Sequence, residues 1–266
     1  MDLGIKNRVA LVLGAGGGLG RAIAVSLTGE GARLAIADIN AKALEETADA
    51  VAAAGPKGQQ KNVSAHAFDL SDLPTIDAQI GMIEKEFGPV DILINNTGGP
   101  PPTPAAGQDP VAWAKHFQSM VLSVIAITDH VLPGMRSRKW GRIVTSTSSG
   151  VVAPIPNLGI SNALRLSLVG WSKTLAREVA RDGITANIIL PGRIGTQRIK
   201  FLDEQKAKRE NRTVESVAAE STASIPIGRY GEPQEYADAV AFLASQRASY
   251  ITGAVIRVDG GLIASI

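Results

Sequence analysis

The 266-residue chain contains no cysteine, and this absence excludes several kinds of site at once. Without thiols there can be no disulfide framework, no thiolate nucleophile and no metal site with cysteine ligands. Such a chain is indifferent to the redox state of its compartment. This fits a cytoplasmic location, which we take as our prediction.

The chain also has little net charge and no long apolar run. Its 27 Lys and Arg residues against 25 Asp and Glu residues leave a formal charge of +2, without the basic excess expected of proteins that bind nucleic acid or anionic membranes. The best apolar candidate, Met120–Thr128, is interrupted by Ser123 and falls short of the ~18 residues that span a bilayer. The apolar stretch Val9–Leu13 is too brief for a signal peptide. We therefore predict a soluble protein with no membrane or nucleic-acid partner.

What the chain does have is a 45% apolar fraction, arranged in alternating short and long segments. Short apolar runs, typical of strands, occur at Val9–Leu13, Leu34–Ala37, Ile92–Ile94, Ile143–Val144, Ala186–Leu190 and Ala254–Val258. Helical patterns lie between them, at Leu19–Glu30, Ala41–Ala54, Ile76–Phe87, Val111–Leu132, Leu164–Ala180 and Pro233–Ser245. Strands buried on both faces that alternate with helices predict an α/β fold with a doubly wound parallel sheet and helices on both faces. No repeat or linker divides the chain, so we expect a single domain over 1–266.

Two segments interrupt this alternation. Residues 98–110 contain five prolines, which predict a stiff extended loop rather than a helix. Residues 193–225 form a long, charge-rich insertion, and loops of this length are often functional. Its charges fit either a solvated helical face or a lid over the substrate. In the second case Arg193, Arg198 or Lys200 would face an acidic substrate.

A glycine-rich turn at residues 13–20, LGAGGGLG, follows the first predicted strand and opens the first helix. Gly14, Gly18 and Gly20, with Leu19 between the last two, predict a tight Rossmann-type turn that approaches a pyrophosphate and packs the helix on the sheet. The free N–H groups and the dipole of the helix N-terminus favour phosphate binding there. The turn therefore predicts a dinucleotide site.

An acidic residue, Asp38, ends the second predicted strand about 18 positions after Gly20. A carboxylate there can bind both hydroxyls of an adenosine ribose and would repel a 2′-phosphate. No Lys or Arg lies within the turn before Gly18, and Arg33 precedes the strand. We therefore predict that NAD(H) is favoured over NADP(H). A helix N-cap or a surface turn is the alternative role for Asp38.

Further motifs follow in a fixed order along the chain. They are Asp69-Leu70, NNTG at Asn95–Gly98, GRIVTSTSS at Gly141–Ser149, PG at Pro191-Gly192 and ITGAVIRVDGG at Ile251–Gly261. With the glycine turn, they resemble the short-chain dehydrogenase/reductase family over nearly the whole chain, and in particular its bacterial 3-oxoacyl reductases. The resemblance implies a nicotinamide cofactor, a small carbonyl or alcohol substrate and a homo-oligomer, either a tetramer or a dimer.

The resemblance also assigns cofactor contacts to residues near the carboxyl ends of the strands. By this likeness Asp69 and Leu70 would flank the adenine. The remaining nucleotide would be lined by Asn96, Thr97 and Gly98, and the nicotinamide by Pro191, Gly192, Ile194 and Thr196.

The catalytic signature is where this sequence departs from the family it resembles. The family's reductases use a Tyr and a Lys four residues apart on one helix, with a Ser at the end of the preceding strand. Ser148 matches that serine, but Ser161 stands at the tyrosine position and Arg165 at the lysine position. The segment Gly170–Glu178, GWSKTLARE, fits the family helix without a gap and fixes this alignment. Met120 stands where the family has an Asn inside a helix, and we expect it to pack in the core.

No other tyrosine offers itself as a replacement, since the chain has only Tyr230, Tyr236 and Tyr250. A serine hydroxyl is far less acidic than a phenol, whose pKa is about 10. Arg165 keeps its positive charge and can bind ribose hydroxyls, but it cannot release a proton as Lys can. The sequence thus predicts that the chain binds a cofactor, with Arg165 among the contacts, but lacks the family's usual proton relay.

Three functions remain open on the sequence. The first is an NAD-dependent oxidoreductase in which Ser148, Ser161 or a water supplies the proton and Asn162 holds the substrate oxygen. The second is a nucleotide-binding, non-catalytic homologue, such as a sensor or partner subunit, which the joint changes at Met120, Ser161 and Arg165 favour. The third is a non-redox lyase or isomerase, against which the intact nucleotide motifs argue. The retained Ser148 puts the oxidoreductase first.

Overall fold

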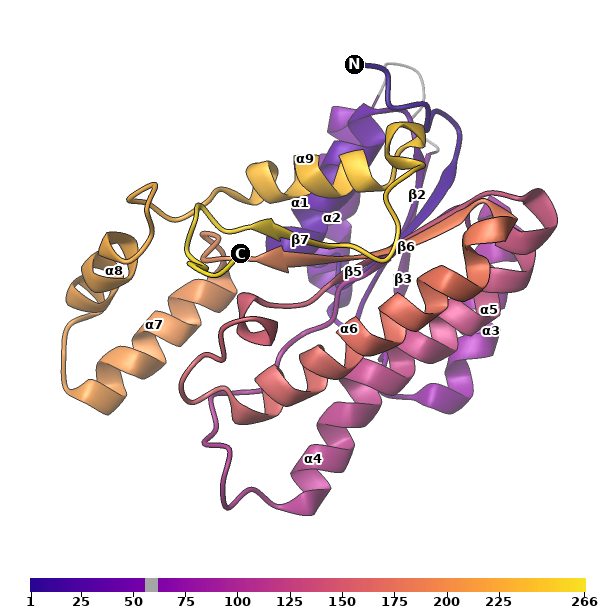
Figure 1. The fold of residues 1–266 in the computed structure, drawn as a ribbon. Coiled ribbons are helices and arrows are strands. Elements are labelled where there is room, and N and C mark those ends of the chain that lie inside the picture. Colours follow the sequence, from indigo (N-terminus) through magenta and orange to yellow (C-terminus); the bar gives the residue numbers. More distant parts are fainter. Residues whose placement is uncertain (56–61) are drawn as a thin grey trace.

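The parallel sheet carries the architecture of this computed structural model, which describes residues 1–55 and 62–266. Within these residues a seven-stranded parallel sheet has the order β3-β2-β1-β4-β5-β6-β7 (Figure 1). The strands are β1 Val9–Leu13, β2 Arg33–Asp38, β3 Val63–Ala67, β4 Ile92–Asn95, β5 Gly141–Ser146, β6 Ile184–Pro191 and β7 Val255–Val258. The order reverses direction between β1 and β4. This confirms the predicted doubly wound α/β fold.

Helices cover both faces of the sheet (Figure 1). One layer contains α1 Gly18–Gly29, α2 Ala41–Ala54 and α9 Pro233–Leu243. The other contains α3 Leu73–Phe87, α4 Pro110–Phe117, α5 Ser123–Arg138 and α6 Gly159–Val179. Short helical turns occupy Gln118–Leu122, Ser149–Val151, Ala180–Asp182 and Gln246–Ala248.

Strand β1 shows why the sequence forms this sandwich. Leu11 and Leu13 pack into the layer that contains α3 and α5, while Ala10 and Val12 pack into the layer with α1 and α9. All these side chains are fully buried, so the strand appears in the sequence as a continuous apolar run.

Two elements differ from the sequence expectation. Strand β3 lies at the sheet edge with half-buried or exposed side chains, so it leaves no apolar run in the sequence. The predicted helix ending at Leu132 instead continues through Pro133 to Arg138. Proline costs a helix one backbone hydrogen bond, but Val131 and Met135 on either side of it are fully buried in the core. Burial of this face therefore outweighs the local propensity to stop.

The continuous helix Pro110–Arg138 is, among the described residues, long and apolar enough to cross a membrane by length and composition. The sequence expectation differed because it counted uninterrupted apolar runs, which Ser123 breaks. In the fold, Val124, Ile127 and Val131 of this helix are buried among α3, α6 and the sheet. The helix is thus packed as a core helix of the domain.

The two irregular segments lie at the carboxyl edge of the sheet. The loop before Pro110 has no helix, and Thr103 pairs with the backbone on either side of Leu158, through Asn157 O and Gly159 N. Between β6 and α9 the chain forms α7 Gln197–Glu210 and α8 Val214–Ala223, which project away from the sheet (Figure 1). Both segments therefore flank the edge where the glycine turn lies.

Candidate active site

A cavity of about 690 Å³ opens at the carboxyl ends of the strands. Its wall combines the glycine turn, the ends of β2, β4, β5 and β6, the first turns of α6, and α7. The sequence-predicted residues that line it are Gly14, Gly18, Leu19, Asp38, Asn96, Thr97, Gly98, Ser148, Ser161, Arg165, Pro191, Gly192, Ile194 and Thr196. One cavity thus contains both the predicted nucleotide residues and the predicted catalytic residues.

The glycine turn requires glycine at three positions for different reasons. Gly14 and Gly18 have φ of 59° and 53°, in the left-handed region that side chains disfavour. A Cβ on Gly20 would lie 2.0 Å from Gly14 O, and a Cβ on Gly14 would lie 2.4 Å from Asn96 O. The turn is therefore pressed against α1 on one side and the end of β4 on the other, as close approach to a pyrophosphate requires.

The carboxylate of Asp38 is held at the rim of this turn. Gly16 N donates to Asp38 Oδ2 at 2.9 Å, and Asn40 N donates to Oδ1 at 3.0 Å. The N-cap of α2 is Asn40, whose side chain accepts from Ala43 N. Asp38 is therefore not a helix N-cap, whereas its bond with Asn40 N is the turn contact that the sequence left as the other alternative. Its carboxylate lies on the cavity wall, where a ribose would be bound.

The residues predicted to flank adenine lie outside the lining of the cavity. Asp69 is exposed, and its carboxylate accepts from the backbone and the hydroxyl of Ser71, both at 2.8 Å. Leu70 packs against the apolar layer of α3. Their contact with a nucleotide stays a prediction.

The residues predicted to line the nicotinamide lie in the loop after β6, which faces the glycine turn. A Cβ on Gly18 would contact Thr196, with Cβ and Cγ2 at 3.5 Å. Gly192 lies so close to Asp259 that a Cβ would come within 2.5 Å of its Cα. This close contact between Gly192 and Asp259 holds the loop after β6 across the cavity from α1.

Four serines line this cavity, Ser146, Ser148, Ser149 and Ser161, and two of them are the predicted catalytic residues Ser148, just after β5, and Ser161 of α6. Ser148 Oγ accepts a hydrogen bond from Gly150 N at 3.1 Å, which orients the hydroxyl and leaves its proton for a ligand. Ser161 is 5% exposed and lines the same wall. Asn162 instead turns its amide to Ile155 O at 2.9 Å and is not part of the lining. In this conformation the amide nitrogen of Asn162 is engaged with Ile155 O, so its contact with a substrate oxygen stays a prediction.

Arg165 ties three backbone carbonyls together beneath the cavity. Its Nη1 donates to Ser146 O at 3.2 Å, and its Nη2 donates to Thr97 O and Gly98 O at 3.1 and 3.2 Å. Burial, together with the nearby charge of Arg198, lowers the pKa of Arg165 to about 10, so the group is charged at neutral pH. The guanidinium thus braces the ends of β4 and β5, in addition to the ribose contact that its position predicts.

The phenol of Tyr236, which the sequence does not place near the site, lies behind the same cavity wall. Tyr236 of α9 is fully buried, with its Oη 2.8 Å from Ser146 Oγ. Burial raises the pKa of Tyr236 above its ordinary value, so it remains neutral. It is not part of the cavity lining, whereas Ser146 is. No sequence pattern indicates this contact, since Tyr236 sits in an ordinary amphipathic helix far along the chain.

The helix distortion at Met120 is present without the family's asparagine. Residues Gln118–Leu122 form a π-helical turn between α4 and α5, a feature often found near functional sites. Met120 is 2% exposed and packs with Ile160 and Leu164 of α6. The expectation that Met120 belongs to the core is confirmed.

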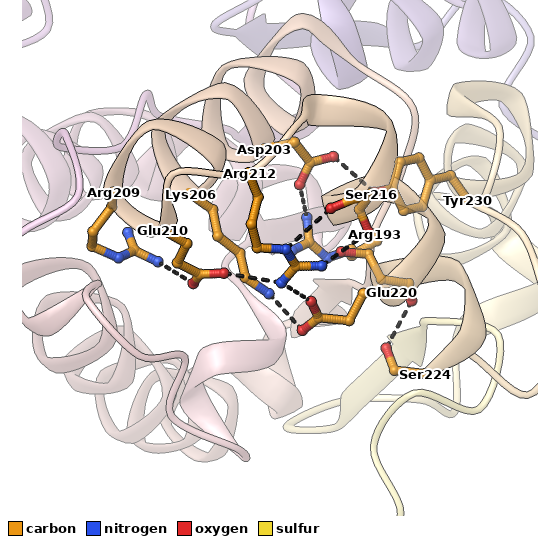
Figure 2. A network of polar contacts seen from close by, with 11 residues as sticks. Arg193, Asp203, Lys206, Arg209, Glu210, Arg212, Ser216, Glu220, Ser224 and Tyr230 are labelled. Carbon is orange, nitrogen blue, oxygen red and sulfur yellow. Dashed lines mark hydrogen bonds and ion pairs between the residues drawn. The ribbon is translucent and has the colours of Figure 1, made fainter.

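The charges of residues 193–225 mostly pair with one another (Figure 2). Arg193 and Tyr230 both bind the buried carboxylate of Asp203, at 2.8 and 2.7 Å. The other pairs are Lys206 with Glu220, Arg209 with Glu210, and Arg212 with both Glu210 and Glu220. Lys206 thereby joins α7 to α8, and Arg212 joins the turn between these helices to both of them.

Comparison with known proteins identifies the family of this chain. A family model described as enoyl-(acyl carrier protein) reductase matches residues 14–263. The chain is 36% identical over 263 residues to the 3-oxoacyl-(acyl-carrier-protein) reductase FabG of Salmonella typhimurium, covering 98% of this chain and 99% of that protein. It is 33% identical to nodulation protein G of Azospirillum brasilense, covering 97% and 99%.

Solved structures agree in fold. YwfH, an NADPH-dependent reductase involved in bacilysin biosynthesis, is 30% identical with a TM-score of 0.92, over 98% of this chain and all of that one. The L-sorbose reductase of Gluconobacter frateurii, solved with NADPH and L-sorbose, is 30% identical with a TM-score of 0.91, over the full length of both chains.

Proposed function

The chain belongs to the short-chain dehydrogenase/reductase family, and from that premise we propose that it is an NAD(H)-dependent oxidoreductase with a non-standard proton source. Its substrate is a small carbonyl or alcohol compound. The observation that carries the proposal is the single cavity, in which the glycine turn and Asp38 share a wall with Ser148 and Ser161.

The residues around the turn fit a dinucleotide. A Cβ on Gly17 would meet nothing within 4 Å, so the backbone at the start of α1 is open to the cavity. The N–H groups of this helix start suit phosphate, and Asp38 suits an unsubstituted ribose. When bound, the cofactor would supply or accept the hydride. The NADPH named for the two solved relatives makes NADP(H) the alternative, and Asp38 is the reason we favour NAD(H).

The chain's own part in the chemistry falls to the two serines. Ser148, oriented by Gly150 N, would donate a hydrogen bond to the substrate oxygen and stabilise the charge that develops there. Serine is too weak an acid to replace a phenol, so we propose that Ser148 or Ser161 passes a proton from water in the cavity. The space left by the small side chain of Ser161 provides room for that water.

The test of this mechanism is Ser148→Ala. We expect the rate of NADH-dependent reduction to fall by about 10- to 100-fold, because one preorganised donor is lost, while NADH affinity stays within about twofold. Ser167→Ala is the matched control, since Ser167 Oγ bonds Leu164 O and lies outside the cavity lining. Unchanged turnover in Ser148→Ala would remove Ser148 from the mechanism.

A second candidate is a nucleotide-binding homologue that does no chemistry. The bracing of three carbonyls by Arg165 favours it, because such a role serves structure without any proton transfer. Single-turnover mixing of the NADH complex with a panel of ketones separates the two functions. The oxidoreductase oxidises bound NADH with at least one of them, and the sensor with none.

Three further statements stay predictions from the sequence. They are a cytoplasmic location, a homodimer or homotetramer, and the role of residues 193–225 as a substrate lid on the single domain 1–266.

A further inference from the structure

The cavity wall carries an excess of positive charge. Among its described lining residues the cationic ones are Arg165, Arg193, Arg198, Lys206 and Arg209, against a single carboxylate, that of Asp38. Asp38 is engaged with Gly16 N and Asn40 N. The cavity therefore offers much more cationic than anionic surface to a ligand.

Pairing within the protein accounts for three of these cations. Arg193 is bound to Asp203 at 2.8 Å, Lys206 to Glu220 at 2.7 Å, and Arg209 to Glu210 at 3.2 Å. Each of the three therefore has a carboxylate partner, although Glu210 and Glu220 are shared with Arg212 (Figure 2).

Arg165 and Arg198 differ from these three cations because their partners are backbone carbonyls. Arg198 Nη2 donates to Pro100 O at 2.7 Å, and Arg165 donates only to the carbonyls described above. In the part of the chain that the structure describes, no carboxylate forms an ion pair with either guanidinium. Burial lowers the pKa of both groups, as expected for cations held away from water without a counter-ion.

The two guanidinium groups converge on one point of the proline-rich loop. A Cβ on Gly99 would lie 3.1 Å from Arg198 Nη2 and 3.7 Å from Arg165 Nη2. Neither group uses all five of its N–H donors in the protein contacts of the described residues. Two partly desolvated like charges this close destabilise each other unless an anion binds to them.

The position of the pair separates it from the predicted pyrophosphate site. The glycine turn faces Thr196, whereas the arginine pair faces Gly99. Arg165 follows Ser161 by one helical turn on α6, so the two side chains share a face. Its partner carbonyl, Ser146 O, precedes Ser148 by two residues. The pair therefore lies at the serine end of the cavity.

We propose that Arg198, supported by Arg165, binds the carboxylate of an acidic substrate, so that the enzyme acts on an oxo acid or hydroxy acid. The inference rests on the proposed function for the reaction, but the anion site itself does not. Of the three insertion residues considered for this role, Arg193 is already paired and Lys200 is exposed outside the lining, which leaves Arg198.

The experiment measures carboxylate binding apart from turnover. The thermal midpoint is followed against acetate and pyruvate, with chloride at equal ionic strength, for the wild type, Arg198→Met and Lys200→Met. Pyruvate and methyl pyruvate are then titrated by calorimetry into each protein saturated with NAD⁺, which cannot reduce them. Lys200→Met is the matched control, because it removes one charge from the same helix outside the cavity.

We expect the carboxylates to raise the midpoint of the wild type and of Lys200→Met, and to leave Arg198→Met unshifted. Arg198→Met should bind pyruvate at least about tenfold more weakly, with the ester and NADH changed by less than about twofold. The absence of any carboxylate-specific shift in the wild type would overturn the proposal. So would a selective loss of NADH or NADPH affinity in Arg198→Met, since the pair would then serve the cofactor.

The outcome also separates this inference from the proposed function. Carboxylate binding in a protein that binds no NADH would refute the oxidoreductase and retain the anion site. NADH binding without a carboxylate effect would refute the anion site and retain the oxidoreductase.

Discussion

The two ends of the cavity are built from different parts of the chain. At the predicted cofactor end the wall includes the backbone of Gly14, Gly17 and Gly18, and Gly14 and Gly18 have a φ that disfavours a side chain. At the serine end the wall is mainly side chains, among them Ser148, Ser161 and Arg165. The sequence motifs predict a cofactor site at the backbone-built end, and they predict an altered catalytic set at the side-chain-built end.

The difference follows from what the fold needs at each end. The glycine turn connects β1 to α1, so a change there disturbs the centre of the sheet. Helix α6 is held by Ile160, Leu164 and Leu168, which pack around Met120 and Val121. Its cavity-facing positions 161 and 165 can therefore change without loss of the core. A fold can thus conserve nucleotide binding while its chemistry is altered.

The largest expected effect comes from Gly20→Ala at the cofactor end. Its new Cβ would lie 2.0 Å from Gly14 O, so the turn must move. We expect a loss of at least about 3 kcal/mol in the free energy of unfolding, and no detectable NADH binding. Gly29→Ala, in the same helix with nothing within 4 Å, should instead gain about 0.5 kcal/mol. Denaturant unfolding and NADH fluorescence check both, and equal stability of the two variants would contradict this account of the turn.

A middle-sized effect is expected from restoring the family pair with Ser161→Tyr and Arg165→Lys. A phenol in the cavity supplies a general acid, so reduction of the neutral ketone ethyl acetoacetate should rise at least about tenfold. The matched control is Ser161→Phe with Arg165→Lys, which adds the ring without the hydroxyl. Steady-state NADH oxidation measures both. An equal rate in the two variants would show that the phenol is not what the serine end lacks.

The smallest effect is expected from Asp38→Ala. Loss of the ribose-binding carboxylate should weaken NADH binding by about tenfold and leave NADPH binding unchanged or improved. The ratio between the dissociation constants of NADPH and NADH should therefore fall. Asp49→Ala serves as the comparison, since Asp49 is an exposed carboxylate of α2 outside the cavity lining. A preference that stays the same in Asp38→Ala would remove Asp38 from cofactor selection.

The sequence predicts the interior of the fold better than its edges. Strand β1 has the predicted bounds, because burial on both faces produces an unbroken apolar run. The edge strand β3, VSAHA, lacks that signal, since its side chains are half-buried or exposed. Helix α5 passes Pro133 because tertiary burial of its neighbours outweighs a local rule.

In the candidate site, the residues are predictable but their directions are not. Spacing and resemblance place Ser148, Ser161 and Arg165 in the cavity wall. Whether Asn162 faces the cavity depends on the backbone at the start of α6, which turns its amide to Ile155 O. The choice among the charged residues of 193–225 depends on their partners. The loop before α7 brings Arg193 to Asp203, and the packing of α7 on α8 brings Lys206 to Glu220.

The measurement that tests the central claim most directly is a fluorescence titration of the purified protein with NADH and, in parallel, NADPH. If the backbone-built end is intact, NADH binds with a dissociation constant well below millimolar, and NADPH binds more weakly. Absence of binding by either nucleotide at millimolar concentration would contradict the account, because the glycine turn and Asp38 would then serve the fold alone.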